Sequence, residues 1–354
     1  RAMRETDGRR WSTVYQRLTH LFAIAGVALI LAGCAGGGLG ALLGLIGIGG
    51  AVGQIQDLFG SDTDDDADVI LDGQVIRTIS RGTSELRLRG LPEGRHLLQI
   101  VATEFRGIVR LIDVDADSDL QLGALEAQDG GMISGRVTMR DTDGSTRAAV
   151  RVPVYAIPGG AVTVAEGQPV TTIPPAGTHY VAYTDGNGQF VLSAVTAGDY
   201  LVTATVAGYM ADVQLVAGLQ ASQRKRNMDL ELVQDANAPA GRAQGIASGR
   251  TGGGSVSLGG ASVRARLAAG YAPAIPQATI TRIQNAYGAD LRSAPWFRWN
   301  VLSTLADNGG SYVLPLPPGT HRVDAFAYNY QPAYRDVAIT ANATTGADFT
   351  LDAR

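Results

Sequence analysis

Short runs of alternating apolar and polar residues fill the chain from residue 68 to its end. Glycine, proline, asparagine and aspartate interrupt these runs every few residues, which is typical of strands joined by tight turns. A period of two places the apolar side chains on one face of each strand, and that face must be buried against a second sheet. The pattern predicts an all-β protein built from tandem β-sandwich modules.

One signature occurs three times, at 85–103, 189–207 and 311–328, and consists of an alternating strand, a turn and a second alternating strand. The turn glycines are Gly94, Gly198 and Gly319, and glycine suits such turns because it adopts a positive φ without a Cβ clash. We predict that the two strands beside each glycine are antiparallel neighbours. In the second copy, the side chains predicted to face the core are Phe190, Leu192, Leu201 and Thr203, or their neighbours in register.

A second signature closes each unit, beginning at Asp119, Asp229 and Asp348. Together the two signatures divide the chain into modules at 67–125, 126–236 and 237–354.

The second module resembles the carboxypeptidase regulatory-like domain, a transthyretin-like β-sandwich. The matching residues are Ser134-Gly-Arg-Val, the Thr184-Asp-Gly-Asn-Gly-Gln-Phe turn, which we expect to form a hairpin, and the run from Ala197 to Tyr209. The third module resembles the same family through Ala306-Asp-Asn-Gly-Gly-Ser-Tyr. This resemblance implies a non-catalytic domain, because the family contributes no catalytic residues to peptidases.

The first module resembles a PEGA-type domain, a small β-domain of bacterial envelope proteins. The residues that carry this resemblance are Val69-Ile-Leu-Asp-Gly and Leu91-Pro-Glu-Gly-Arg-His.

The N-terminal 1–33 segment has the pattern of a secretory signal, with basic residues followed by an apolar run from Leu21 to Leu31. The motif Leu31-Ala32-Gly33-Cys34 resembles the lipobox of bacterial lipoproteins, in which the peptide is cut before a cysteine whose thiol carries a diacylglycerol. Cys34 is also the one cysteine of the chain. We therefore expect a lipoprotein held in a membrane of the cell envelope, and Ala35 after the cysteine favours the outer membrane or cell surface.

Residues 34–66 combine a glycine-rich apolar segment with an acidic linker. Glycines recur every four residues in 35–53, which fits a self-associating membrane helix, but so many glycines also fit a flexible spacer. Both interpretations stay open. The five aspartates of 62–68 lack the other residues of a calcium loop, so a solvated linker is preferred.

The formal net charge of −4 argues against nucleic acid as a partner. The histidines are scattered without zinc-hydrolase spacing, and a nucleophile elbow is missing. His96 and His321 occupy the same position of the repeat, two residues after the turn glycine, which indicates a structural role. We expect no catalytic residues, no metal site and no cofactor.

The insertion 271–299 of the third module is the part with binding character. Its candidate ligand-binding residues are Tyr287, Trp296 and Trp299, because aromatic rings stack on sugars and are frequent in binding sites. The same rings would also fit a sandwich core. Analogy of fold favours carbohydrate or peptidoglycan as the ligand of a non-catalytic envelope protein. The alternative is a structural stalk or assembly subunit that binds envelope proteins.

Overall fold

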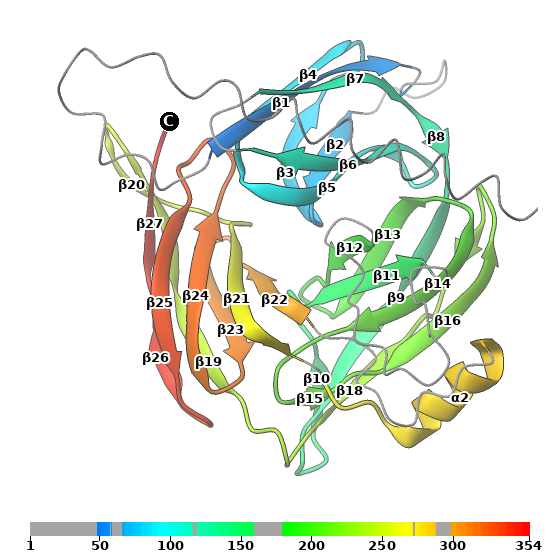
Figure 1. Cartoon of the computed structure of the whole chain (residues 1–354), viewed down its shortest axis with the longest axis vertical. Coiled ribbons are helices and arrows are strands. Elements are labelled where there is room, and N and C mark those ends of the chain that lie inside the picture. The colour runs from blue at the N-terminus through cyan, green and yellow to red at the C-terminus, as the bar shows by residue number, and fades with distance from the viewer. Residues whose placement is uncertain are drawn as a thin grey trace, which may run out of the picture. The chain divides into compact units, whose positions relative to one another are not determined.

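The computed structural model describes residues 48–56, 58, 66–115, 119–158, 179–271, 273–287 and 299–354. The chain divides into two compact units, Arg1–Leu45 and Ile46–Arg354, and all described residues lie in the second. Strands dominate this part of the chain, and one helix, α2 (Gln277–Tyr287), is found among the described residues (Figure 1). The predicted all-β fold is therefore confirmed. The described residues contain no helix long and apolar enough to cross a membrane.

The first module contains strands β1 to β8 in two sheets. One sheet has the order β4 (Glu85–Pro92), β1 (Ile48–Gln56) and β7 (Asp119–Glu126). The other has the order β3 (Gln74–Ile79), β2 (Ala67–Leu71), β5 (Gly94–Thr103), β6 (Arg106–Val114) and β8 (Gln128–Asp129).

The second module contains β9 to β18. The long strand β9 (Gly131–Arg140) pairs with β10 (Thr146–Ala148), β13 (Gln189–Val195), β17 (Arg224–Lys225) and β18 (Leu230–Gln234), and β15 (Tyr209–Met210) pairs with β18. The facing sheet has the order β12 (Tyr180–Tyr183), β11 (Pro153–Pro158), β14 (Gly198–Ala204) and β16 (Val213–Leu219).

The third module contains β19 to β27. Its long strand β19 (Gly241–Thr251) pairs with β20 (Gly254–Ser257), β23 (Ser311–Leu316), β26 (Thr344–Gly346) and β27 (Phe349–Asp352). The facing sheet has the order β22 (Trp299–Leu305), β21 (Ser262–Tyr271), β24 (Gly319–Phe326) and β25 (Ala333–Ile339).

The three modules share one pairing scheme. An opening strand (β1, β9 or β19) pairs antiparallel with the first strand of the repeated signature (β4, β13 or β23). The same opening strand pairs parallel with the strand of the closing signature (β7, β18 or β27). Both signatures therefore meet on the opening strand, which explains why they recur together in the sequence.

Strand β1 corrects the interpretation of the glycine-rich segment. Residues 48–53, the end of the segment considered as a membrane helix, lie in this strand, and Ala51 is fully buried in the core of the first module. A helix is therefore wrong for these residues. Strand β1 also precedes residue 67, where the sequence placed the start of this module, and without it β4 and β7 would have no common partner.

The repeated glycines form corners between sheets, so the predicted antiparallel pairing across them is wrong. Strands β4 and β5, β13 and β14, and β23 and β24 each belong to two different sheets. Gly94, Gly198 and Gly319 have φ values of 120°, 153° and 136° and carry the chain across the core. The Asp185-Gly-Asn-Gly turn also links two sheets, β12 to β13, and is no hairpin. Alternation identifies a buried face but not the strand that pairs beside it.

Each sheet of the second module has one face in its sandwich core. Phe190 and Leu192 lie there as predicted, whereas the inward residues of β14 are Tyr200, Val202 and Ala204. Leu201 is buried on the other face, in a cluster shared with the third module, and Thr203 donates a hydrogen bond to the Asp212 carbonyl (2.8 Å). Both faces of β14 are thus buried, so alternation along it did not distinguish the core side.

Candidate functional site

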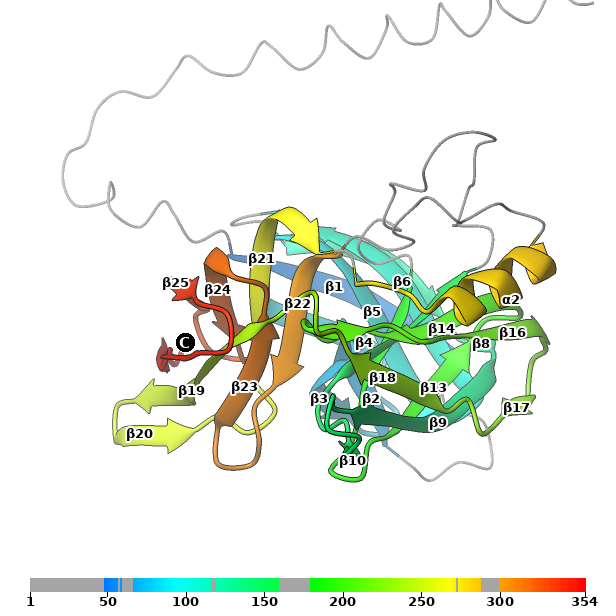
Figure 2. The ribbon, with the colours of Figure 1, turned by 90° about the horizontal axis from the view of Figure 1, so that it is seen from below.

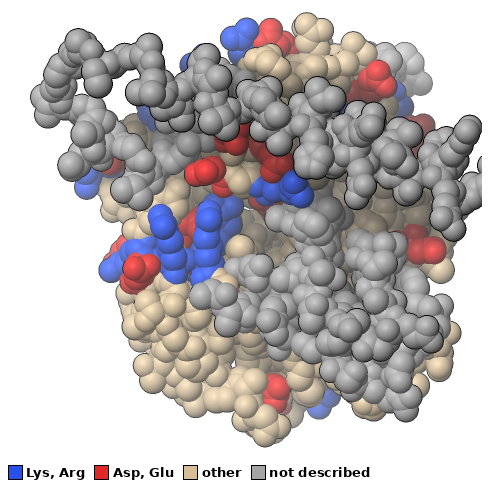
Figure 3. Space-filling model, in the orientation of Figure 1, with Lys and Arg blue, Asp and Glu red and all other residues tan. Residues whose placement is uncertain are grey.

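The sheet β22-β21-β24-β25 has one apolar and one polar face. Val263, Ala265, Val323 and Ala325 point into the core of the third module. The alternate residues Arg264, Arg266, Arg322 and Asp324, with Tyr334 on β25, form the opposite face, which we call the arginine face. Figure 3 shows arginine side chains gathered over β21, β24 and β25 as placed in Figure 1. A pleated sheet produces this separation because successive side chains alternate between its faces.

The arginine face is buried at one end and open at the other. Phe326 and Ser262 are only 2% and 5% exposed, and Phe326 belongs to the core cluster of the first module. Two residues further along β21, the Arg264 side chain is 16% exposed, and two further again the Arg266 side chain is 56% exposed. Arg322 is also exposed. A ligand can therefore reach Arg266 and Arg322 directly.

Asp324 is the buried anchor of this face. Its side chain is 1% exposed, and its Oδ2 accepts hydrogen bonds from Nε (2.9 Å) and a terminal nitrogen (2.7 Å) of Arg264. Burial lowers the pKa of the Arg264 guanidinium, but Asp324 and Asp72 outweigh this and raise it. A buried carboxylate needs such a partner, because an unpaired charge in the interior is costly. The Arg264 guanidinium is thus engaged by Asp324 inside the protein and is largely unavailable to a ligand.

The next row of the face brings two cations opposite each other. Arg266 on β21 is the register partner of Arg322 on β24, and Asp336 on β25 is the next partner of Arg322. The nearest acid to Arg266 is Asp324, whose Oδ1 lies 3.7 Å from its Nε. The Arg322 guanidinium lies 4.7 Å from the centre of the Tyr334 ring. Burial raises the pKa of Tyr334, with a smaller contribution from Asp324, so the ring stays neutral.

The turn between β2 and β3 reaches the buried end of the arginine face. Gln74 Nε2 donates a hydrogen bond to the Gly260 carbonyl of the third module (2.9 Å). A Cβ at Gly73 would lie 2.8 Å from the Val181 carbonyl oxygen of the second module, so only glycine fits there. Tyr183 of the second module and Ser303 of the third share a hydrogen bond (2.8 Å). All three modules therefore meet behind the arginines.

Burial at this junction disfavours the charged forms of its side chains. Burial raises the pKa of the Tyr155 and Tyr183 hydroxyls. Burial also lowers the pKa of His179 to about 4. The neutral forms prevail because burial disfavours charge. The junction is a structural contact, and the open end of the arginine face is the part available to ligands.

The predicted structural role of the repeat histidines is confirmed. His96 Nε2 lies 2.9 Å from the Pro92 carbonyl, and His321 Nε2 lies 2.8 Å from the Pro317 carbonyl. In the second module Tyr200 replaces histidine, and its hydroxyl donates to the Thr196 carbonyl (2.8 Å). Each module therefore ties the residue two after its corner glycine to the residue two before it.

The sequence-predicted ligand residues lie at the margin of what the structure describes. Trp296 lies outside the described residues, as do Leu31, Ala32, Gly33 and Cys34. Tyr287 ends α2, and Trp299 begins β22 as the register partner of Tyr271. The structure describes the backbone but not the side chain of Tyr287 and Trp299, so their role in binding stays a prediction.

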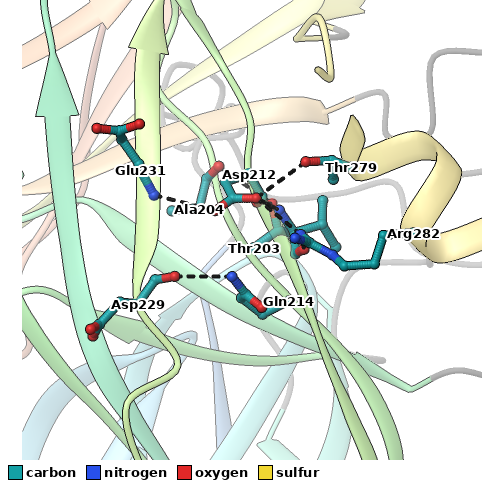
Figure 4. Close-up of polar contacts among 9 residues, drawn as sticks. Thr203, Ala204, Asp212, Gln214, Asp229, Glu231, Thr279 and Arg282 are labelled. Atoms are coloured by element: carbon teal, nitrogen blue, oxygen red, sulfur yellow. Dashed lines mark hydrogen bonds and ion pairs between the residues drawn. The ribbon is translucent and has the colours of Figure 1, made fainter. Parts of the chain in front are cut away.

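Helix α2, which belongs to the insertion, packs on the second module. Figures 2 and 4 show it beside β14 and β16. Asp212 accepts hydrogen bonds from Thr279 (3.4 Å) and Arg282 (3.3 Å), and Ile280 packs against the shared apolar cluster. These contacts fasten the insertion to its neighbour. Among the described residues, no group of three or more His, Cys, Asp or Glu lies close enough to hold a metal ion.

No protein-family model and no curated protein sequence matches the chain. Among solved structures, a streptococcal ancillary pilin matches with 14% identity over 87% of this chain and 99% of that one, at a TM-score of 0.22. A shaft pilin of Lactobacillus rhamnosus GG has 11% identity over 64% and 98%, also at 0.22. A proposed carbohydrate-binding protein of Pseudomonas aeruginosa has 17% identity over 30% and 88%, again at 0.22. At these TM-scores the similarities carry no argument about function.

Proposed function

We propose that this chain is a non-catalytic, lipid-anchored protein of the cell envelope whose β-sandwich modules bind carbohydrate or peptidoglycan. The observation that carries the binding role is the arginine face, because exposed guanidinium groups lie on a sheet that Asp324 fixes from below. A binding site gains affinity when its groups are held in place before the ligand arrives. The lipobox-like motif ending at Cys34 supports the anchor, at the outer membrane or cell surface.

The ligand is tested with the full chain in detergent micelles. We expect it to be retained on insoluble peptidoglycan or on an immobilised polysaccharide and released by the same glycan in solution. The uncoated resin is the control for trapping of the lipidated chain. Failure to bind peptidoglycan and a panel of neutral and acidic polysaccharides would refute the glycan-binding function.

The alternative is a structural stalk or assembly subunit that binds envelope proteins. The observation that favours it is the three-way junction, in which Gln74–Gly260 and Tyr183–Ser303 hydrogen bonds join neighbouring modules. Such contacts would keep the modules fixed against one another under load. The stalk hypothesis predicts concentration-dependent assembly of the full chain in sedimentation equilibrium, and a monomer at every concentration would count against self-assembly.

A further inference from the structure

We propose that the arginine face binds the carboxylate groups of an acidic polysaccharide, with Arg266 and Arg322 as the residues that contact them. This inference rests on the proposed glycan-binding function and narrows it to a ligand class. Three features of the face support it: the register of the two arginines, the state of their hydrogen-bonding groups and the way they are held.

The strand register brings two positively charged side chains together at a place that does not contribute to the sandwich core. Arg266 and Arg322 are direct partners on neighbouring strands, about 4.8 Å apart in the hydrogen-bonding direction. Like charges at such positions oppose sheet formation. Residues on this open part of the sheet contribute nothing to the sandwich core, which lies on the other face. An anion placed between the two guanidinium groups would remove this repulsion.

The donors of both arginines remain available. Within the described part of the chain, neither the Arg266 nor the Arg322 guanidinium donates a hydrogen bond, since the closest acid contact is the 3.7 Å approach of Arg266 to Asp324. A guanidinium carries five N–H donors in a planar fork that matches the two oxygens of a carboxylate. Asp336, the register neighbour of Arg322, offsets part of the charge. Arg264 is paired inside the protein, so at the open end of the face Arg266 and Arg322 lie beside the single carboxylate of Asp336, in a chain whose net charge is −4.

The surrounding residues hold the two arginines in position. Asp324 is fixed by Arg264 and draws Arg266 towards the sheet. The Tyr334 ring lies under the Arg322 guanidinium, and a cation over an aromatic face is attracted to it. Asp324 and Tyr334 are therefore positioning residues, whereas Arg266 and Arg322 contact the ligand.

The test is isothermal titration of the full chain in detergent with polygalacturonate, whose sugars carry carboxylates, and with neutral dextran. We expect the double variant R266Q/R322Q to lose affinity for polygalacturonate by about tenfold or more, since each charge-assisted bidentate contact is strong. The matched control R89Q/R242Q removes two exposed arginines elsewhere and should change affinity less than about twofold. Raising NaCl from about 50 to about 300 mM should weaken binding of the parent chain.

Each other outcome has a defined meaning. Equal binding of polygalacturonate by parent and R266Q/R322Q overturns the inference, and so does stronger competition by poly-aspartate or inorganic phosphate than by the acidic glycan. Retention on neutral glycan or peptidoglycan without affinity for polygalacturonate overturns the inference but leaves the proposed function intact. Absence of binding to every glycan ends both. If the double variant melts at a lower temperature than the parent chain, the single variant R266Q replaces it in the test, because the Arg266 side chain is 56% exposed.

Discussion

The imidazole Nδ1 of His96 lies 2.7 Å from Asp72 Oδ2, and its Nε2 lies 2.9 Å from the Pro92 carbonyl. The Leu97 N–H donates to the other Asp72 oxygen (2.9 Å). The carboxylate thus joins the β2–β3 turn to the corner at β5.

This pair predicts a dependence of stability on pH. Burial raises the pKa of the Asp72 carboxyl, but His96 and the Leu97 N–H outweigh it and hold the pKa below the usual 3.8. A carboxyl with a lowered folded pKa stabilises the protein above its unfolded pKa, and this contribution is lost as pH falls below about 4. D72N should cost about 1 kcal/mol near pH 6, because the group is about one-third exposed, and nearly nothing near pH 2.

Urea unfolding of D72N and the parent across this pH range measures the difference. D113N is the control, since Asp113 forms an exposed ion pair with Arg95. A D72N deficit that is the same at every pH would contradict the assignment.

The hydrogen bond at the corner of the second module predicts that Y200F lowers the free energy of unfolding. Tyr200 is 3% exposed, and burial raises its pKa to about 12, so the hydroxyl remains a donor to the Thr196 carbonyl. Removing it leaves that carbonyl without its partner, at a cost of about 1–2 kcal/mol. Chemical denaturation of Y200F beside Y330F measures this, because the partly buried Tyr330 hydroxyl donates no hydrogen bond among the described residues. Equal stability of the two variants would argue against the corner bond.

A substitution at the corner glycine of the same module should lower stability further than Y200F does. At Gly198 the φ of 153° suits glycine and strains any residue with a Cβ. G198A should destabilise the chain by about 1–3 kcal/mol. G186A changes an exposed glycine without neighbours within 4 Å and is the matched control. If thermal melting temperatures fall equally for both variants, the corner has no special requirement.

The lipid anchor predicts a specific failure of processing. C34S removes the thiol that would carry the diacylglycerol, so the variant should incorporate no labelled fatty acid and remain uncut. Metabolic labelling followed by mass spectrometry of the N-terminus detects both. Lipid on a processed C34S chain would reject the lipobox assignment.

A substitution at Trp299 tests whether this aromatic side chain binds a ligand or packs in the core. If it stacks on a glycan, W299A should lower affinity about 5- to 30-fold, equivalent to about 1–2 kcal/mol, with little change in melting temperature. If it packs in the core, W299A should cost about 3–5 kcal/mol of stability. Titration and thermal melting of the same variant separate the two, and destabilisation without glycan affinity in the parent would favour the stalk.

Sequence patterns predicted the strands well because alternation and turn residues are local properties. Which strands pair with each other is not a local property. The corner glycines were found in the sequence, but their strands pair across different sheets because the chain crosses the core at each of them. Strand β1 was missed because it is rich in glycine, which is depleted in strands, and because it continues the apolar glycine-rich run before it.

The arginine face was not predicted from the sequence, although part of its signal is present there. Arg264 and Arg266 occupy alternate positions between apolar residues, as do Arg322 and Asp324, and this spacing alone assigns each pair to one face of a strand. What the sequence lacks is the register that sets Arg266 opposite Arg322 and Arg264 opposite Asp324. These partners are about 60 residues apart, so only the folded sheet brings them together.

Strand β1 also sets the distance that would separate a lipid anchor at Cys34 from the first module. If Cys34 carries lipid, only residues 35–47 separate the bilayer from the first strand of the fold. Fourteen Cα–Cα steps of a fully extended chain cover at most about 50 Å. A lipid at Cys34 would therefore keep the first module within about 50 Å of the bilayer, and the protein would suit a target close to its own membrane.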